Sequence, residues 1–402
     1  MGQGDEIIQN KDLKLQKEDR LLLLCSRTKV DDLTSKKIES LINPELDWDH
    51  LVEMANRHRL MPLLYVNLNS ICPEKVPEEV LENLKEEFHE NARKNLLLTG
   101  ELVKVMKLLE NNGINAIPFK GPVLAYSIYD NIAYRQFSDI DILINKEGAL
   151  NVKKIVQSLG YELKPDIIVK DSIYMKLFSE YTFVNRNNNL IMELNWNFEG
   201  ISFSFHSNPN FLFNDLEKVE INDYKFKSFQ SINQFLMLCI HASKHFWMRL
   251  SWICDIHEFL QNKNINWDEI LEKSEILGVK RIVLINIILA KELFGLDIPS
   301  QILYLLPHDL KIMSITQNIK KMIFIEQKQS LTIFEKFIFI YSKRENSNDG
   351  FKDCVKGLTK PDYRDFLDIP LKENLFFLYG LIRPFLLLKR YININNKSTD
   401  NL

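Results

Sequence analysis

The chain has 402 residues, of which 46% are hydrophobic and 26% are charged, with 13 glycines and 13 prolines. This composition excludes a disordered or collagen-like protein, and the length allows two or three domains or one body with helical additions. The formal net charge of −3 argues against a general nucleic-acid coating protein. A local basic groove is still compatible with that sum, because a net charge hides how charges are distributed.

The cysteines and the apolar segments bear on the compartment. The five cysteines are scattered without close pairs, at Cys25, Cys72, Cys239, Cys254 and Cys354. Residues 1–20 lack the apolar core of a signal peptide, so we expect reduced thiols and a cytoplasmic protein. The apolar stretch 375–388 is interrupted by Arg383 and Pro384 and is too short to span a bilayer. We expect it to be a buried helix, with a membrane-surface anchor as the alternative.

Residues 1–112 have the spacing of helices. One predicted helix begins at residues 47–50 and continues with helical spacing to Leu64, and a long one runs from Pro77 to Leu109. Residues 113–228 show instead the alternation of an α/β unit, and residues 229–402 are helical again, with Ser231 as a candidate cap. The core is predicted to contain a strand at 114–119, a helix at 122–130, a strand at 139–144, a helix at 147–159 and a hairpin of strands 181–184 and 190–196.

Two short segments of this core carry candidate chemistry. The strand at 114–119 ends at Lys120, Gly121 and Pro122, a turn that leaves backbone N–H groups free at a helix start, where anions bind. Lys120 is the candidate phosphate contact, with a solvated lysine as the alternative. Further on, Asp139 and Asp141 alternate with isoleucines, so on a strand both carboxylates point to one face.

Carboxylates side by side on a strand raise each other's pKa, and a divalent cation removes that cost. Exposed aspartates on an edge strand are the alternative. A third acid, Glu193, lies on a later strand, where it shares a face with Ile191 and Asn195. Three carboxylates together with substrate phosphates suit Mg²⁺. The sequence therefore predicts Asp139, Asp141 and Glu193 as metal ligands and catalytic residues.

The order of strand, Gly-containing turn, helix, Asp-x-Asp strand and later acidic strand resembles the DNA polymerase beta-like nucleotidyltransferase superfamily. Within it, the Lys-Gly turn and Arg135 before the Asp pair resemble a bacterial group of uncharacterised nucleotidyltransferases, from about residue 48 to 391. The resemblance implies an α/β (α+β) core with a mixed sheet between N-terminal and C-terminal helical regions. The chain departs from the group's pattern at Pro122, where a turn Ser is usual, at Asn195, where a His is usual, and in a longer span between turn and Asp pair.

Several further residues are candidates for nucleotide or acceptor contacts. Arg135 is expected to bind the triphosphate or pyrophosphate, with a surface arginine as the alternative. Ser138 is a candidate contact that alternatively only starts the strand. His241, Lys244 and Asp255 are expected to line a cleft between sheet and helices. His241 and His245 share a helix face, but the Glu of a zinc-protease motif is missing, so we prefer cleft-lining or helix-packing histidines to a zinc site.

Together these residues predict a nucleotidyltransferase that uses Mg²⁺, with two ions expected and Mn²⁺ as a substitute. It would move a nucleoside monophosphate from a nucleoside triphosphate to an acceptor hydroxyl or phosphate and release pyrophosphate. The acceptor is open between a small molecule, a peptide or protein, and an RNA end. Two alternatives are kept: a catalytically silent nucleotide sensor or partner-binding protein, and a kinase-like transfer of the γ-phosphate.

Overall fold

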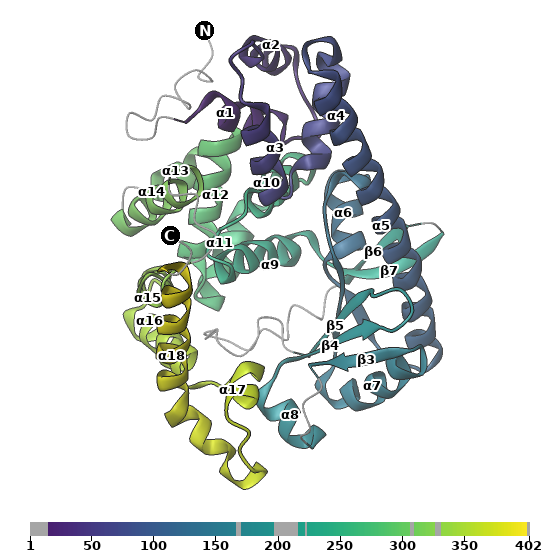
Figure 1. The fold of residues 1–402 in the computed structure, drawn as a ribbon, viewed down its shortest axis with the longest axis vertical. Coiled ribbons are helices and arrows are strands. Elements are labelled where there is room, and N and C mark those ends of the chain that lie inside the picture. Colours follow the sequence, from purple (N-terminus) through teal and green to yellow (C-terminus); the bar gives the residue numbers. More distant parts are fainter. Residues whose placement is uncertain are drawn as a thin grey trace.

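The computed structural model of the chain describes residues 15–165, 170–196, 216–221, 223–305, 309–325 and 331–399. A five-stranded mixed sheet lies between helices that pack on both of its faces (Figure 1). The expected α/β core between two helical regions is therefore confirmed.

The N-terminal region is helical, as expected. Its elements are α1 (Lys17–Cys25), α2 (Asp32–Leu41), α3 (Trp48–Arg57), α4 (Met61–Ile71), η1 (Pro73–Lys75) and α5 (Glu78–Asn111). The long predicted helix is α5. The helix predicted to run on to Leu64 is wrong, because the chain breaks between α3 and α4, where Arg59 has a φ of +58°. Pro62 explains the break, since a proline cannot donate the hydrogen bond that would continue α3.

The sheet has the strand order β1-β2-β5-β4-β3. Only β2 and β5 run parallel; the other neighbours are antiparallel. The region consists of β1 (Ala116–Pro118), α6 (Gly121–Tyr129), η2 (Ile132–Tyr134), β2 (Asp139–Ile144), η3 (Lys146–Gly148), α7 (Ala149–Ser158), β3 (Tyr161–Lys164), α8 (Asp171–Leu177), β4 (Glu180–Asn185) and β5 (Ile191–Asn195). The predicted hairpin is β4 and β5.

The two faces of the sheet have different roles. On one face, Ile140 and Ile142 of β2 and Met192 and Leu194 of β5 are fully buried. They belong to a core that includes residues of α5 and α7, so these helices pack against this face of the sheet. The opposite face carries the acids, because side chains alternate along a strand.

A second hairpin and the C-terminal helices complete the fold. They are β6 (Leu216–Ile221), β7 (Tyr224–Phe229), α9 (Ser231–Lys244), α10 (Leu250–Asn262), α11 (Trp267–Leu277), α12 (Lys280–Phe294), α13 (Ser300–Leu305), α14 (Leu310–Phe324), α15 (Ile333–Ser342), α16 (Ser347–Thr359), α17 (Tyr363–Asp368), η6 (Glu373–Leu378) and α18 (Tyr379–Thr399). The hairpin was not predicted. Ser231 is the first residue of α9 rather than its cap, which is Gln230 without a side-chain cap bond.

Helices from both ends of the chain share one hydrophobic core. Leu21 and Leu64 from the N-terminal part are buried in the same cluster as Phe235, Ile253 and Ile287 from the C-terminal part. The boundary at 112 lies beside the end of α5, whereas the boundary at 228 lies within the last two residues of β7, just before α9. The division of the chain into three domains stays a prediction.

The apolar stretch 375–388 differs from the expected buried helix. Tyr379 and Leu386 are buried, but Phe377, Leu381 and Phe385 are about 70% exposed (72%, 69% and 73%). Phe377 belongs to η6, and α18, which carries Leu381 and Phe385, packs on α16 and α17. No helix in the described ranges has the length and apolar character to cross a membrane.

Candidate functional site

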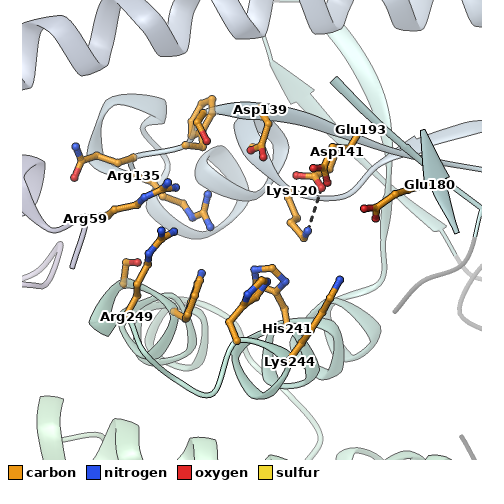
Figure 2. A pocket seen from close by; sticks show the side chains of 17 residues that line it. Arg59, Lys120, Arg135, Asp139, Asp141, Glu180, Glu193, His241, Lys244 and Arg249 are labelled. Carbon is orange, nitrogen blue, oxygen red and sulfur yellow. Dashed lines mark hydrogen bonds and ion pairs between the residues drawn. The ribbon is translucent and has the colours of Figure 1, made fainter. Parts of the chain in front are cut away.

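A polar cavity of about 340 Å³ lies between the acidic face of the sheet and helices α9 and α10 (Figure 2). Nine predicted site residues line it: Lys120, Gly121, Arg135, Ser138, Asp139, Asp141, Glu193, His241 and Lys244. His245, which the sequence offered as a cleft-lining or helix-packing histidine, also lines it. The lining further contains residues that the sequence did not single out as site residues: Arg59, Gln136, Phe137, Glu180, Arg249, Ser251 and Trp252. Chain segments from residue 59 to residue 252 therefore meet at one cavity.

The sheet places the acids next to one another. In the parallel pair β2 and β5, Asp141 lies opposite Glu193, and Asp139 precedes them on the same face. Glu180, on the neighbouring strand β4, adds a fourth carboxylate to the cavity wall. Burial, followed by the charges of Asp141, Glu180 and Asp139, raises the pKa of Glu193 to about 8. Burial and the Asp141 charge likewise raise the pKa of Asp139. The raised pKa values of Asp139 and Glu193 indicate that the cavity residues do not fully stabilise the negative charge of these carboxylates.

Lys120 is the cation that lies among these acids. Its Nζ donates a hydrogen bond to Asp141 Oδ1 at 3.0 Å, shown as the dashed line in Figure 2. Burial alone would lower the pKa of Lys120, but the charges of Asp141, Glu193 and Asp139 together raise it above its ordinary value. Lys120 is also the residue before α6, whose first turn has no side-chain cap. The ammonium therefore lies where a helix start and the acids meet.

Gly121 is required by geometry at this junction. Its φ is +54°, and a Cβ built on it would lie 3.1 Å from the Asp139 carbonyl oxygen. We expect Gly121→Ala to lower the free energy of unfolding by about 1–2 kcal/mol from the left-handed backbone alone. It should also lower activity, because β2 must shift at the first carboxylate. Urea unfolding and a turnover assay measure both effects.

Gly100 provides the matched control. It lies inside α5, and a Cβ there would meet nothing within 4 Å. Gly100→Ala should therefore raise the free energy of unfolding by up to about 1 kcal/mol, as alanine does in a helix. If both substitutions have the same effect, the constraint at Gly121 is not the one described.

Asp255 does not line the cavity, which corrects the expectation that it contacts the nucleotide or acceptor. It is almost fully buried and binds Arg135 through both carboxylate oxygens, with N···O distances of 3.0–3.1 Å. The Tyr129 hydroxyl donates to the same carboxylate at 2.7 Å. The reason for the difference is that α10 turns Asp255 toward the interior. Its role is to hold Arg135 at the cavity wall.

The backbone around Arg135 is fixed from α5. Asn95 Nδ2 donates to the Ile132 carbonyl at 2.7 Å and to the Arg135 carbonyl at 2.8 Å, and Asn91 Nδ2 donates to the Ala133 carbonyl at 2.9 Å. The sequence analysis missed both asparagines. Buried asparagines inside the apolar stripe of α5 were the available signal, because a buried amide requires hydrogen-bond partners.

Charge is unevenly distributed around the cavity. The carboxylates lie on the sheet side, whereas Arg59, Arg135 and Arg249 gather at the other end (Figure 2). Arg59 comes from the break between α3 and α4, and Arg249 from the turn between α9 and α10. Lys244 of α9 points into the cavity from the helix side. The cavity thus has an acidic part suited to cations and a basic part suited to an anion such as a triphosphate.

The histidines pack with Trp252. His245 stacks on the Trp252 ring at 4.9 Å between centroids, and His241 contacts both rings edge-on. Burial, followed by the positive charge of Lys120, places the pKa of His241 well below its ordinary value, so it is neutral at pH 7. Trp247 is a core residue, fully buried and hydrogen-bonded to Asn286, whereas Trp252 lines the cavity.

The acids fit magnesium better than zinc. Within the described residues, no three His, Cys, Asp or Glu side chains converge as a preformed metal site. A structural zinc site needs such a set of protein ligands, whereas Mg²⁺ usually takes one or two carboxylates and completes its shell with water and substrate phosphates. Oxygen donors on one face, with mutually raised pKa values, match the second pattern.

One comparison with known proteins found a match. A family whose description reads "Uncharacterised nucleotidyltransferase" matches residues 44–295. That range starts just before α3, which precedes Arg59, and ends after α12, so it includes every residue of the cavity lining. No curated protein matches the chain.

Proposed function

The chain belongs to the uncharacterised nucleotidyltransferase family, and we propose that it transfers a nucleoside monophosphate from a nucleoside triphosphate to an acceptor hydroxyl or phosphate. A divalent cation, Mg²⁺ or Mn²⁺, would assist, and pyrophosphate would leave. The observation that carries this proposal is the polarity of the cavity, with three carboxylates of β2 and β5 on one side and three arginines on the other. A triphosphate with its divalent cations complements this arrangement, because the cations can bind the carboxylates and the phosphates can bind the arginines.

The residues of the chain would act as follows. Arg59, Arg249 and Lys244 bind the β- and γ-phosphates, because guanidinium and ammonium groups pair with phosphate oxygens. The acceptor oxygen attacks the α-phosphorus, a new P–O bond forms, and the bond to the pyrophosphate oxygen breaks. The proton of an acceptor hydroxyl passes to the carboxylate of Asp139 or Asp141. The arginines then stabilise the charge on the departing pyrophosphate.

Asp139, Asp141 and Glu193 would hold the metal ions. When bound, such ions lower the pKa of the acceptor hydroxyl and neutralise charge on the phosphates. Lys120 would exchange its bond to Asp141 for a phosphate oxygen, since its positive charge then matches the substrate. Lys120 would thus balance the negative charge of the carboxylates before the substrate binds and would contact a phosphate oxygen afterwards.

A product assay tests the proposal. The purified protein is incubated with each labelled nucleoside triphosphate, Mg²⁺ and fractions of a cell extract, and the products are identified. We expect pyrophosphate and a labelled acceptor. Nucleoside diphosphate would indicate γ-phosphate transfer instead. Binding of nucleotide by calorimetry without any turnover would indicate the silent sensor, the alternative that Pro122 in place of a turn Ser favours.

A further inference from the structure

A second cavity, of about 660 Å³, adjoins the first. The two cavities share Lys244, His245, Arg249 and Trp252, so these four residues form a common wall. We call the second cavity the annex. The rest of its lining comes from α3, from the segment after α9 and from the region of α15: Glu53, Asn56, Arg57, Phe246, Met248, Leu331 and Lys336. Its volume is in the range of small-molecule sites.

The annex is basic. Arg57, Lys244, Arg249 and Lys336 contribute four cationic groups, while Glu53 is the one carboxylate among the described residues of the lining. Even if Glu53 neutralises Arg57 on the same helix, three cationic groups remain: Lys244, Arg249 and Lys336. A cavity of this kind attracts an anionic group and stabilises it by charge-assisted hydrogen bonds.

The shared wall is rigidly built. The Arg249 guanidinium carbon lies 5.2 Å from the centroid of the Trp252 ring, and His245 stacks on the same ring. Because the ring already contacts these two groups, it serves to position them rather than to offer an open surface for a nucleobase. A neutral nucleobase would also gain less from these cations than an anionic group does. The annex therefore fits the acceptor better than the base of the nucleoside triphosphate.

We propose that the annex binds the acceptor, and that the acceptor is a small molecule with a phosphate or carboxylate group in addition to its reacting hydroxyl. The inference rests on the proposed nucleotidyl transfer. The anionic group lies near Arg57 and Lys336, and the hydroxyl reaches past the shared wall toward Asp139 and Asp141. The volume of the annex, about 660 Å³, fits a small acceptor better than a long nucleic acid.

Calorimetry with three matched probes tests this proposal. Glycerol, glycerol 3-phosphate and glycerate are titrated into the full chain saturated with Mg²⁺ and a non-hydrolysable nucleoside triphosphate. We expect glycerol 3-phosphate, glycerate or both to bind at least about tenfold more tightly than glycerol. The two anionic probes distinguish a phosphate-bearing from a carboxylate-bearing acceptor.

Substitutions then locate the binding. The double variant Arg57→Gln, Lys336→Gln should lose most of the preference for the anionic probes while its affinity for the triphosphate changes less than about twofold. Lys104→Gln, an exposed lysine on α5 outside both linings, is the control and should bind as wild type does. Thermal unfolding confirms that each variant folds.

The proposal is overturned if glycerol binds as well as the anionic probes, or if the double variant weakens triphosphate binding instead. It is also overturned if a short RNA oligonucleotide binds in the annex more tightly than either anionic probe. Failure of the proposed function appears separately, as absence of pyrophosphate release in the product assay. The probes are then titrated alone, and the comparison with the double variant still reports on the annex.

Discussion

Asp141→Asn should reduce the rate of pyrophosphate release by roughly 10³-fold or more, because metal-assisted charge stabilisation supplies several kcal/mol of the barrier reduction. Asp141 lies between Asp139 and Glu193 on the acidic face and binds Lys120. The asparagine keeps the volume of the side chain but removes its charge. Pyrophosphate release with a labelled triphosphate measures the effect.

The fold should tolerate this change. The substitution removes the ion pair with Lys120, which costs stability, but it also removes a charge that raises the pKa of Asp139 and Glu193. These two effects oppose each other, so we expect the free energy of unfolding to change by less than about 1 kcal/mol.

Asp130→Asn is the matched control for the loss of a carboxylate. Asp130 is exposed, lies just after α6, and has a φ of +54°, a conformation that asparagine adopts readily. It should keep full activity. Wild-type turnover by Asp141→Asn would mean that the acids of β2 do not form the reaction centre.

The acids of the site could be recognised from the sequence because strands alternate. Asp139 and Asp141 alternate with isoleucines, which puts both carboxylates on one face of the sheet. By the same argument, Glu193 lies on the other face of its strand from the buried Met192 and Leu194. What the pattern does not contain is the register. That Asp141 lies opposite Glu193 depends on the parallel pairing of β2 with β5, which tertiary packing decides.

The basic end of the cavity could not be predicted in the same way. Arg59 faces the acids only because the chain breaks before Pro62, and Arg249 only because α9 and α10 are joined by a short turn. Neither position belongs to a periodic pattern. Their approach to β2 is a long-range contact, for which local spacing gives no signal. The Pro62 signal was present but was outweighed by the helical spacing on both sides.

Asp255 was assigned incorrectly for a related reason. The sequence analysis expected it to line the cleft with His241 and Lys244, but its carboxylate binds Arg135 instead. A charged residue with an unknown partner can equally be a ligand contact or half of a buried ion pair. The sequence alone does not distinguish these roles, because the partner, Arg135, lies 120 residues earlier in the chain.

The buried pair of Arg135 and Asp255 provides the largest expected effect on stability. Asp255→Ala leaves the Arg135 guanidinium, which is only 12% exposed, without its carboxylate, and the Tyr129 hydroxyl loses its acceptor. Removing one partner of a buried ion pair costs about 3–5 kcal/mol. We therefore expect Asp255→Ala to lower the free energy of unfolding by that amount, as measured by urea denaturation.

The double variant Arg135→Leu, Asp255→Leu separates stability from function. Replacing a buried ion pair by apolar side chains is often neutral for stability, so this variant should recover most of the loss seen in Asp255→Ala. It should nevertheless bind the triphosphate more weakly than wild type, because the guanidinium at the cavity wall is gone. Recovery of both stability and triphosphate affinity would show that Arg135 only supports the fold. Recovery of stability alone would mean that the ion pair holds a cation in place for the phosphates.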